Sequence, residues 1–190
     1  ILNPTLIYCY DAYCGWCYGF SLVIKKIAEE YKHKLEFEVL SGGMVISEEA
    51  KPISVTAAYI QQAYKVVEEH TGIKFGSDYL WHINNPDLSD WYALHYEGRD
   101  LCDDEAYTHL LEKYSIVPET FYTKLKSEAY KEMAYYEFAL CKQLNVDSFP
   151  QVLIQLSENK FYLLAKGFTA YEELKERIER VLAETESISG

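Results

Sequence analysis

The sequence predicts an α/β fold in which both ends of the chain contribute strands to one sheet, with an all-helical subdomain inserted between them. Three observations predict it. A strand, a helix and a second strand follow one another at the start, and two strands and a helix occur at the end. The stretch between them shows helical periodicity without a clear strand. The expected core covers residues 1–46 and 146–190, and the helical insertion covers residues 47–145.

The start of the chain predicts a βαβ unit. Thr5–Tyr10 is a nearly continuous apolar run, typical of a strand buried on both faces. A helix follows over about residues 14–33, because apolar residues recur there at helical spacing with Lys and Glu on the other side. Leu35–Leu40 alternates apolar and acidic residues as an edge strand does, with Phe37 and Val39 facing inward. The two strands should run parallel with a right-handed crossover.

The middle of the chain predicts a block of helices. The stretch Gly72–Cys102, punctuated by proline and glycine, shows no clear pattern. The expected helices are Ser54–His70, Asp104–Tyr114, one that begins at Pro118, and one that Ser127 caps and that runs to about Leu144.

The end of the chain predicts a hairpin and a final helix. Gln151–Leu156 and Lys160–Ala165 read as two strands joined by a polar turn at residues 157–159. Thr169 and Glu172 have the spacing of a capping box. One face of the helix that follows carries the apolar residues Leu174, Ile178, Val181 and Leu182.

Charge and hydropathy exclude two classes of partner. With 18 Lys and Arg against 30 Asp and Glu, the formal net charge is −12, which repels nucleic acid and anionic lipid. The longest charge-free runs, Ala12–Ile24 and Pro52–Tyr64, are shorter than the roughly 20 residues that span a bilayer. We therefore expect no nucleic-acid or membrane partner and a cytoplasmic location. Because the sequence starts at Ile1, a chain whose export signal has been removed is the alternative.

The most informative motif is Cys14-Gly15-Trp16-Cys17, which follows a strand and opens a helix. A cysteine with a pKa near ~8.5 is mostly protonated, but the partial positive charge of a helix N-terminus favours the thiolate. Cys14 should therefore be the solvent-facing, attacking thiolate. Cys17, one turn inside, can attack a mixed disulfide at Cys14 and release the product. Such a pair carries two electrons itself and needs no bound cofactor.

Two metal-binding interpretations compete with this one. A CxxC pair is often half of a zinc site, but the remaining Cys and His show no second paired spacing. Cys9, Cys14 and Cys17 have the spacing of a plant-type iron–sulfur loop, with Cys102 or Cys141 as the fourth ligand. Because Cys9 lies inside an apolar strand, we expect no metal. Cys9, Cys102 and Cys141 are then buried small apolar residues, or Cys102 and Cys141 form a second redox pair.

Three residues in or next to the motif are candidates for binding the substrate or tuning the thiols. Tyr13 and Trp16 flank the thiols on a turn, where they could form an apolar lip for an unfolded peptide or another apolar thiol substrate. Asp11 is either a turn residue at the strand end or a group that tunes the thiol. A negative charge close to the thiol would disfavour the thiolate.

At this point the residues resemble a known family. The run Asp11–Phe20 resembles the DsbA-like branch of the thioredoxin superfamily, and is closest to the predicted protein-disulfide isomerases near the FrnE type. Asn145–Ile154 and Lys166-Gly167-Phe168 resemble the cis-proline strand and the glycine after the hairpin. With the step Gly42-Gly43-Met44, the resemblance runs the length of the chain.

The resemblance implies a thioredoxin-like four-stranded mixed sheet in the order second, first, third, fourth, with the third strand antiparallel to the first. It also implies that Phe149–Pro150 is cis, packs against the disulfide and presents its backbone to the substrate. Cys14 would attack and Cys17 would resolve. The dipeptide Gly15-Trp16 departs from the Pro-His of strongly oxidising periplasmic enzymes, which leaves the redox direction open.

We therefore expect a thiol–disulfide oxidoreductase of the protein disulfide isomerase type. Its catalytic residues would be Cys14 and Cys17, and its substrate-binding residues Pro150, Phe149, Trp16 and Tyr13. Substrates would be protein or small-molecule thiols and disulfides, with a recycling reductant or oxidant and glutathione as a candidate co-substrate. Glutathione-dependent isomerases and kappa-type glutathione transferases share the fold, but they typically use a serine or a single thiol. A non-catalytic binding module is the remaining alternative.

Overall fold

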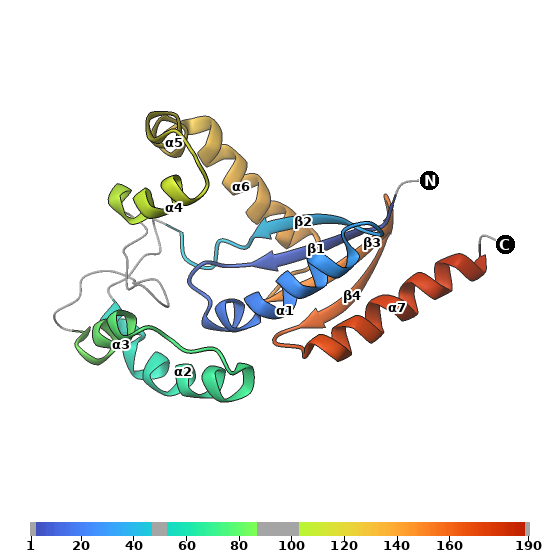
Figure 1. The fold of residues 1–190 in the computed structure, drawn as a ribbon, viewed down its shortest axis with the longest axis horizontal. Helices are drawn as coiled ribbons and strands as arrows, with labels where there is room; N and C mark the ends of the chain where they lie inside the picture. Colours follow the sequence, from blue (N-terminus) through green and yellow to red (C-terminus); the bar gives the residue numbers. More distant parts are fainter. Residues whose placement is uncertain (1–2, 47–52, 87–102, 189–190) are drawn as a thin grey trace. The chain divides into compact units, whose positions relative to one another are not determined.

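The computed structural model describes residues 3–46, 53–86 and 103–188, which divide into two compact units (Figure 1). The first unit consists of Ile1–Gly42 and Phe138–Gly190, and the second of Gly43–Glu137. The expected insertion runs to residue 145, whereas the division falls at Phe138. The difference arises because Leu140 and Cys141 pack with the sheet rather than with the other helices.

The first unit contains a four-stranded sheet in the order β2-β1-β3-β4. β1 pairs parallel with β2 and antiparallel with β3, and β3 pairs antiparallel with β4. This confirms the thioredoxin-like mixed sheet and its strand order. The elements are β1 (Thr5–Tyr10), α1 (Gly15–Tyr31), β2 (Glu36–Ser41), the end of α6 (Glu128–Gln143), β3 (Gln151–Ser157), β4 (Lys160–Lys166) and α7 (Tyr171–Ile188).

Side-chain alternation along β1 gives the sheet two buried faces. Leu6 and Tyr8 point to the face that α1 and α7 cover, where they join the larger core cluster (Figure 1). Ile7 and Cys9 point to the opposite face, where they pack against the end of α6. A strand covered on both faces must be apolar at consecutive positions, which is why Thr5–Tyr10 lacks the alternation of β2.

β2 differs from the inward pattern expected for it. Val39 is 48% exposed, although Phe37 on the same face packs against the core. Leu40, on the face of the acidic residues, is buried in the cluster at the end of α6. The period of two is therefore correct, but helix cover changes from one face to the other along the strand, so that the buried side changes with it.

The start of α7 also differs from the expectation. Its first main-chain hydrogen bond runs from Leu174 N–H to the Ala170 carbonyl, which places the N-cap at Ala170 rather than at Thr169. The predicted apolar face is confirmed, since Leu174, Ile178 and Val181 are buried in the core. Across the described ranges, no helix combines the length and the apolar character that crossing a membrane requires.

The described part of the second unit is helical, as predicted. The Asp104–Tyr114 segment begins as a 3-10 turn, and Ser127 Oγ accepts a hydrogen bond from Tyr130 N–H at the start of α6 as expected. Sequence analysis missed α3, which buries Tyr79 and Ile83 four residues apart. In the described residues of this unit the other elements are η1 (Ile53–Val55), α2 (Ala57–Thr71), α3 (Ser77–Asn84), η3 (Asp104–Tyr107), α4 (Thr108–Lys113) and α5 (Pro118–Leu125).

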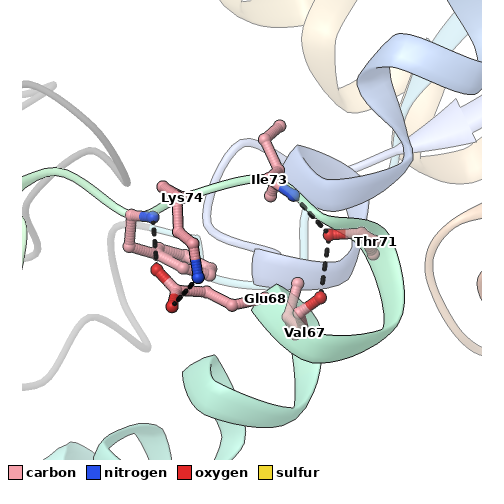
Figure 2. A network of polar contacts seen from close by, with 6 residues as sticks. Val67, Glu68, Thr71, Ile73 and Lys74 are labelled. Carbon is pink, nitrogen blue, oxygen red and sulfur yellow. Dashed lines mark hydrogen bonds and ion pairs between the residues drawn. The ribbon is translucent and has the colours of Figure 1, made fainter.

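A polar network fixes the turn between α2 and α3 (Figure 2). Thr71 Oγ1 donates to the Val67 carbonyl at 2.8 Å and accepts from Ile73 N–H at 3.3 Å. The Glu68 carboxylate accepts from Lys74 Nζ at 3.0 Å and from the backbone N–H of Phe75 at 2.9 Å. Two of these bonds satisfy the backbone N–H groups of Ile73 and Phe75, which lie in the loop between the two helices.

Candidate active site

The turn between β1 and α1 is built by Asp11. Its Oδ1 accepts from Tyr13 N–H at 2.9 Å, and its carbonyl accepts from Cys14 N–H at 3.2 Å. The Asp11 side chain is buried. These two bonds turn the chain directly from the central strand into the helix, so Asp11 acts as the strand-end turn residue that was one of its two expected roles.

Cys14 caps the N-terminus of α1 with its own sulfur. The residue is extended (φ −84°, ψ 109°), its Sγ accepts from Cys17 N–H at 3.3 Å, and its carbonyl accepts from Tyr18 N–H at 3.1 Å. The first N–H groups of a helix have no helical partner and carry partial positive charge. The Cys14 sulfur is therefore held where a negative charge is stabilised.

The two thiols of the motif have opposite ionisation tendencies. The hydrogen bond from the Cys17 side chain lowers the pKa of Cys14, and the backbone N–H groups of Trp16 and Cys17 lower it further, against burial and the nearby Asp11 charge. The hydrogen bond to Cys14, followed by burial, raises the pKa of Cys17. Of the two thiols, Cys14 is therefore the one that loses its proton more easily, and Cys17 donates toward its sulfur.

The exposure of Cys14 differs from the prediction. Its side chain is only 8% exposed, against 4% for Cys17, so it does not face solvent openly. Its thiol donates to the carbonyl of Phe149 at 3.5 Å. Because this carbonyl cannot accept a bond from the thiolate, ionisation breaks the contact.

The loop that carries Phe149 contains the cis peptide bond Phe149–Pro150, as the resemblance implies. The Pro150 carbonyl accepts from Gly167 N–H at 2.8 Å, and Gly167 has a φ of +83° that favours glycine. The Pro150 ring is fully buried. What this loop presents next to the thiols is thus backbone, in particular the Phe149 carbonyl.

Aromatic side chains connect the motif to the core. Tyr13 and Trp16, the two residues expected to contact substrate, are both partly exposed. The Trp16 ring lies 6.4 Å from the ring of Phe168, which in turn lies edge-on 6.2 Å from Phe20. The partly exposed end of this chain of rings adjoins the site, and its other end is in the core.

Sequence analysis missed two residues that shape the site. The hydroxyl of Tyr8, a residue expected only as part of the apolar strand Thr5–Tyr10, hydrogen-bonds the Cys17 side chain. Burial and that bond raise the pKa of Tyr8, so it remains a proton donor. Successive side chains of a strand point to opposite faces, so the sequence places Tyr8 on the sheet face that α1 covers, and this position could have indicated the contact with Cys17. Gly42 is the second, and no local pattern indicates its role.

Gly42 leaves room for the ring of Phe149. A Cβ atom at position 42 would lie 1.9 Å from Cζ and 2.2 Å from Cε1 of that ring, far inside any tolerated contact. Gly42 N–H also donates to the Tyr10 carbonyl at 2.7 Å, which holds the glycine backbone beside the end of β1. The ring that precedes Pro150 therefore rests directly on main chain.

We expect Gly42→Ala to displace the Phe149 ring and lower the free energy of unfolding by about 1–3 kcal/mol, the usual cost of overpacking. Because the carbonyl of Phe149 contacts Cys14, turnover should fall as well. Urea denaturation and thiol–disulfide turnover measure the two effects. In a Phe149→Ala background the ring is absent, so the same Gly42→Ala change should cost much less. Equal costs in both backgrounds would contradict the contact.

We expect the alkylation of Cys14 by iodoacetamide to reach half its maximal rate below the usual ~8.5 of a cysteine. In Asp11→Asn the midpoint should move to still lower pH, because the Asp11 charge opposes the thiolate. Asparagine keeps an oxygen that can accept Tyr13 N–H. Mass spectrometry of the Cys14 peptide across a pH series gives the rates.

The control for this experiment is Glu29→Gln, which removes one charge from the far part of α1, where Glu29 pairs with Lys32. Its midpoint should equal that of the wild type. A midpoint that stays unchanged or rises in Asp11→Asn would contradict the assigned direction of the Asp11 effect.

The cysteine geometry bears on the metal-binding interpretations. Within the part of the chain that the structure describes, no three His, Cys, Asp or Glu side chains come together as a metal site would need. Cys9, which an iron–sulfur loop would require as a ligand, instead hydrogen-bonds the Cys141 side chain. Cys102 lies outside the described residues.

Comparison with known proteins shows the fold. No protein-family model and no curated protein matches this sequence. Solved structures do match over nearly the whole chain. A proposed protein disulfide isomerase from Nitrosomonas europaea has a TM-score of 0.78 at 20% identity, covering 96% of this chain and 99% of that one. The cytosolic disulfide reductase DsbM from Pseudomonas aeruginosa, solved with GSH, has a TM-score of 0.73 at 19% identity, covering 94% and 99%.

A third match carries a different activity. A 2-hydroxychromene-2-carboxylate isomerase has a TM-score of 0.61 at 13% identity, covering 98% of this chain and 100% of that one. At such identities the likeness concerns the fold alone. The chain has the fold of DsbA-like proteins, as its resemblance to that family implies, and the same fold carries both disulfide chemistry and isomerisation.

Proposed function

We propose that the protein is a thiol–disulfide oxidoreductase of the protein disulfide isomerase type. The Cys14 thiolate attacks one sulfur of a substrate disulfide, and the other sulfur leaves as a thiolate and takes up a proton. Cys17 then attacks Cys14 Sγ, so that the second substrate thiol leaves and a Cys14–Cys17 disulfide remains. Two electrons have passed to the substrate. The opposite pKa shifts of two thiols in hydrogen-bond contact carry this proposal.

The surroundings of the pair suit a disulfide substrate. Tyr8 hydrogen-bonds Cys17 and remains protonated, so a proton donor lies beside the resolving thiol. Trp16 and Tyr13 are partly exposed and would contact apolar parts of the substrate. Phe149 and Pro150 would present their backbone to it. These six residues, with Cys14, form the proposed site.

We further propose that glutathione recycles the pair and that the protein works in the cytoplasm. The likeness in fold to DsbM, described as a cytosolic disulfide reductase and solved with GSH, supports both points. One glutathione thiolate attacks Cys14 Sγ of the Cys14–Cys17 disulfide, and Cys17 leaves and takes up a proton. A second glutathione attacks the mixed disulfide on Cys14, which releases the Cys14 thiol and oxidised glutathione. No bound cofactor or metal is part of this mechanism.

The experiment that tests the proposal equilibrates the protein with glutathione buffers of graded ratio, quenches with acid, and counts alkylated thiols by mass. We expect a single two-electron transition that links Cys14 to Cys17. A potential near about −270 mV would indicate a reductase, and one near about −120 mV an oxidase. If the two thiols stay reduced in the most oxidising buffer, or form only separate glutathione adducts, the proposal is wrong.

A further inference from the structure

A second pair of cysteines meets on the other face of the sheet. Cys9 in β1 and Cys141 near the end of α6 are 0% and 1% exposed, and their side chains hydrogen-bond one another. They share an apolar cluster with Ile7, Leu40 and Leu153. Sequence analysis considered Cys102 as the partner of Cys141, but the partner that the structure places there is Cys9. We call Cys9 and Cys141 the buried thiol pair.

Rigid elements hold both members of the pair. Cys9 lies in the central strand, in register with Leu40 of β2 on one side and Gln151 of β3 on the other. Cys141 Sγ also donates to the carbonyl of Ser41 at 3.5 Å. The two sulfur atoms therefore do not meet by chance motion of a loop, because a sheet centre and a helix bring them together.

The helix end that carries Cys141 is closed by a Schellman motif. Val146 N–H donates to the Cys141 carbonyl at 2.9 Å, and Asn145 N–H donates to the Lys142 carbonyl at 3.1 Å. Asn145 has a φ of +57°, and Val146 packs in the same cluster as Cys141. Three residues after Val146 the chain reaches Phe149, whose carbonyl contacts Cys14. The buried thiol pair is thus connected by a short, ordered stretch to the loop beside the proposed active site.

We propose that Cys9 and Cys141 are a second redox centre, which a low-molecular-weight disulfide such as oxidised glutathione closes to an intramolecular disulfide. One cysteine attacks the glutathione disulfide and releases one glutathione thiol. The other cysteine attacks the resulting mixed disulfide and releases the second. Two electrons leave the protein, the Cys9–Cys141 bond forms, and the two cysteine protons end on the two glutathione molecules.

The rate of oxidation follows from burial. The bond to Cys141, together with burial, raises the pKa of Cys9, so its thiolate is scarce in the closed protein. Glutathione reaches either sulfur atom only when the last turns of α6 open, because both residues are inaccessible. The second centre should therefore oxidise much more slowly than Cys14 and Cys17. Once closed, it ties the end of α6 covalently to β1 and should resist reduction for the same reason.

The test uses a full-length Cys14→Ser, Cys17→Ser, Cys102→Ser variant, so that its outcome is independent of the proposed function. The protein is incubated with oxidised glutathione, quenched with acid, unfolded, alkylated and digested. We expect a peptide pair linked through Cys9 and Cys141, a gain in thermal midpoint over the reduced sample, and loss of both under dithiothreitol. Adding Cys9→Ala should leave only a glutathione adduct on Cys141.

Two results would overturn the proposal. The first is that Cys9 and Cys141 both still react with the alkylating reagent after incubation with oxidised glutathione, even in mild urea that opens α6. The second is that each of the two carries its own glutathione and no linked peptide is found. If the triple serine variant does not fold, the same peptide mapping on the wild-type protein decides. There Cys14 and Cys17 give one linked peptide, and Cys9 and Cys141 must give another that forms more slowly.

Discussion

Cys14→Ser is expected to lower thiol–disulfide turnover by roughly 10³-fold or more, the scale on which removing a nucleophile acts. A serine hydroxyl at this position is not ionised near neutral pH, although the helix N-terminus and the Cys17 N–H still point at it. The measurement is the reduction of a protein disulfide, such as that of insulin, with reduced glutathione as the electron source. Far-UV circular dichroism checks that the variant is folded.

The matched control is Cys17→Ser, which keeps the attacking thiol and removes the resolving one. It should accumulate a mixed disulfide on Cys14 that mass spectrometry detects. The same pair of variants separates the alternatives on this fold. If Cys14→Ser preserved a glutathione-activating reaction, an isomerase or transferase would be favoured. If neither substitution altered the function of the protein, a binding module would be the better interpretation.

The loss of turnover expected in Cys14→Ser depends on the hydrogen bonds that the Cys14 side chain makes, not on its exposure. Cys14 is nearly as buried as Cys17, and its carbonyl neighbour, Phe149, favours the neutral thiol. What distinguishes Cys14 is its position at the N-cap, where N–H groups and the Cys17 thiol donate to it. In the proposed mechanism, hydrogen-bond direction rather than access to solvent therefore selects Cys14 as the nucleophile.

The sheet was largely predictable because each strand carries its own local pattern. The apolar run of β1, the acidic alternation of β2 and the polar turn of the hairpin each indicate their element without knowledge of the rest. The mixed order came only through the resemblance around the thiols and the proline, since strand order depends on contacts between segments far apart in the sequence. The helix α3 was not predicted, because only two buried apolar residues, Tyr79 and Ile83, mark its inner side.

In the candidate site, too, local features could be predicted from the sequence and contacts between distant residues could not. The position of Cys14 and Cys17 at the N-terminus of α1 was predictable, because two thiols three positions apart at a strand–helix junction are a local signal. The contact of Gly42 with Phe149 and that of Cys9 with Cys141 join residues more than a hundred positions apart. No spacing in the sequence encodes such contacts. The sequence predicted Cys9 and Cys141 as buried residues, which the structure confirms, and offered Cys102 rather than Cys9 as a redox partner for Cys141.

Phe20→Ala is expected to lower the free energy of unfolding by about 3–5 kcal/mol, the usual cost of truncating a buried aromatic side chain. Phe20 lies on α1, one turn after Cys17, and is 0% exposed. Its ring lies 5.8 Å from that of Tyr8 and 6.2 Å from that of Phe168. Removing it leaves a cavity between β1 and the segment after the hairpin. Urea denaturation followed by far-UV circular dichroism gives the free energy.

Leu22→Ala on the same helix is the control, because Leu22 is 62% exposed and its truncation should change stability by less than about 0.5 kcal/mol. Phe20 also adjoins Tyr8, whose hydroxyl bonds Cys17, so the cavity should disturb the thiols as well. We expect the alkylation midpoint of Cys14 to move in Phe20→Ala and to stay in Leu22→Ala. A loss below about 1 kcal/mol in Phe20→Ala, or equal losses in both variants, would show that this core does not support the site.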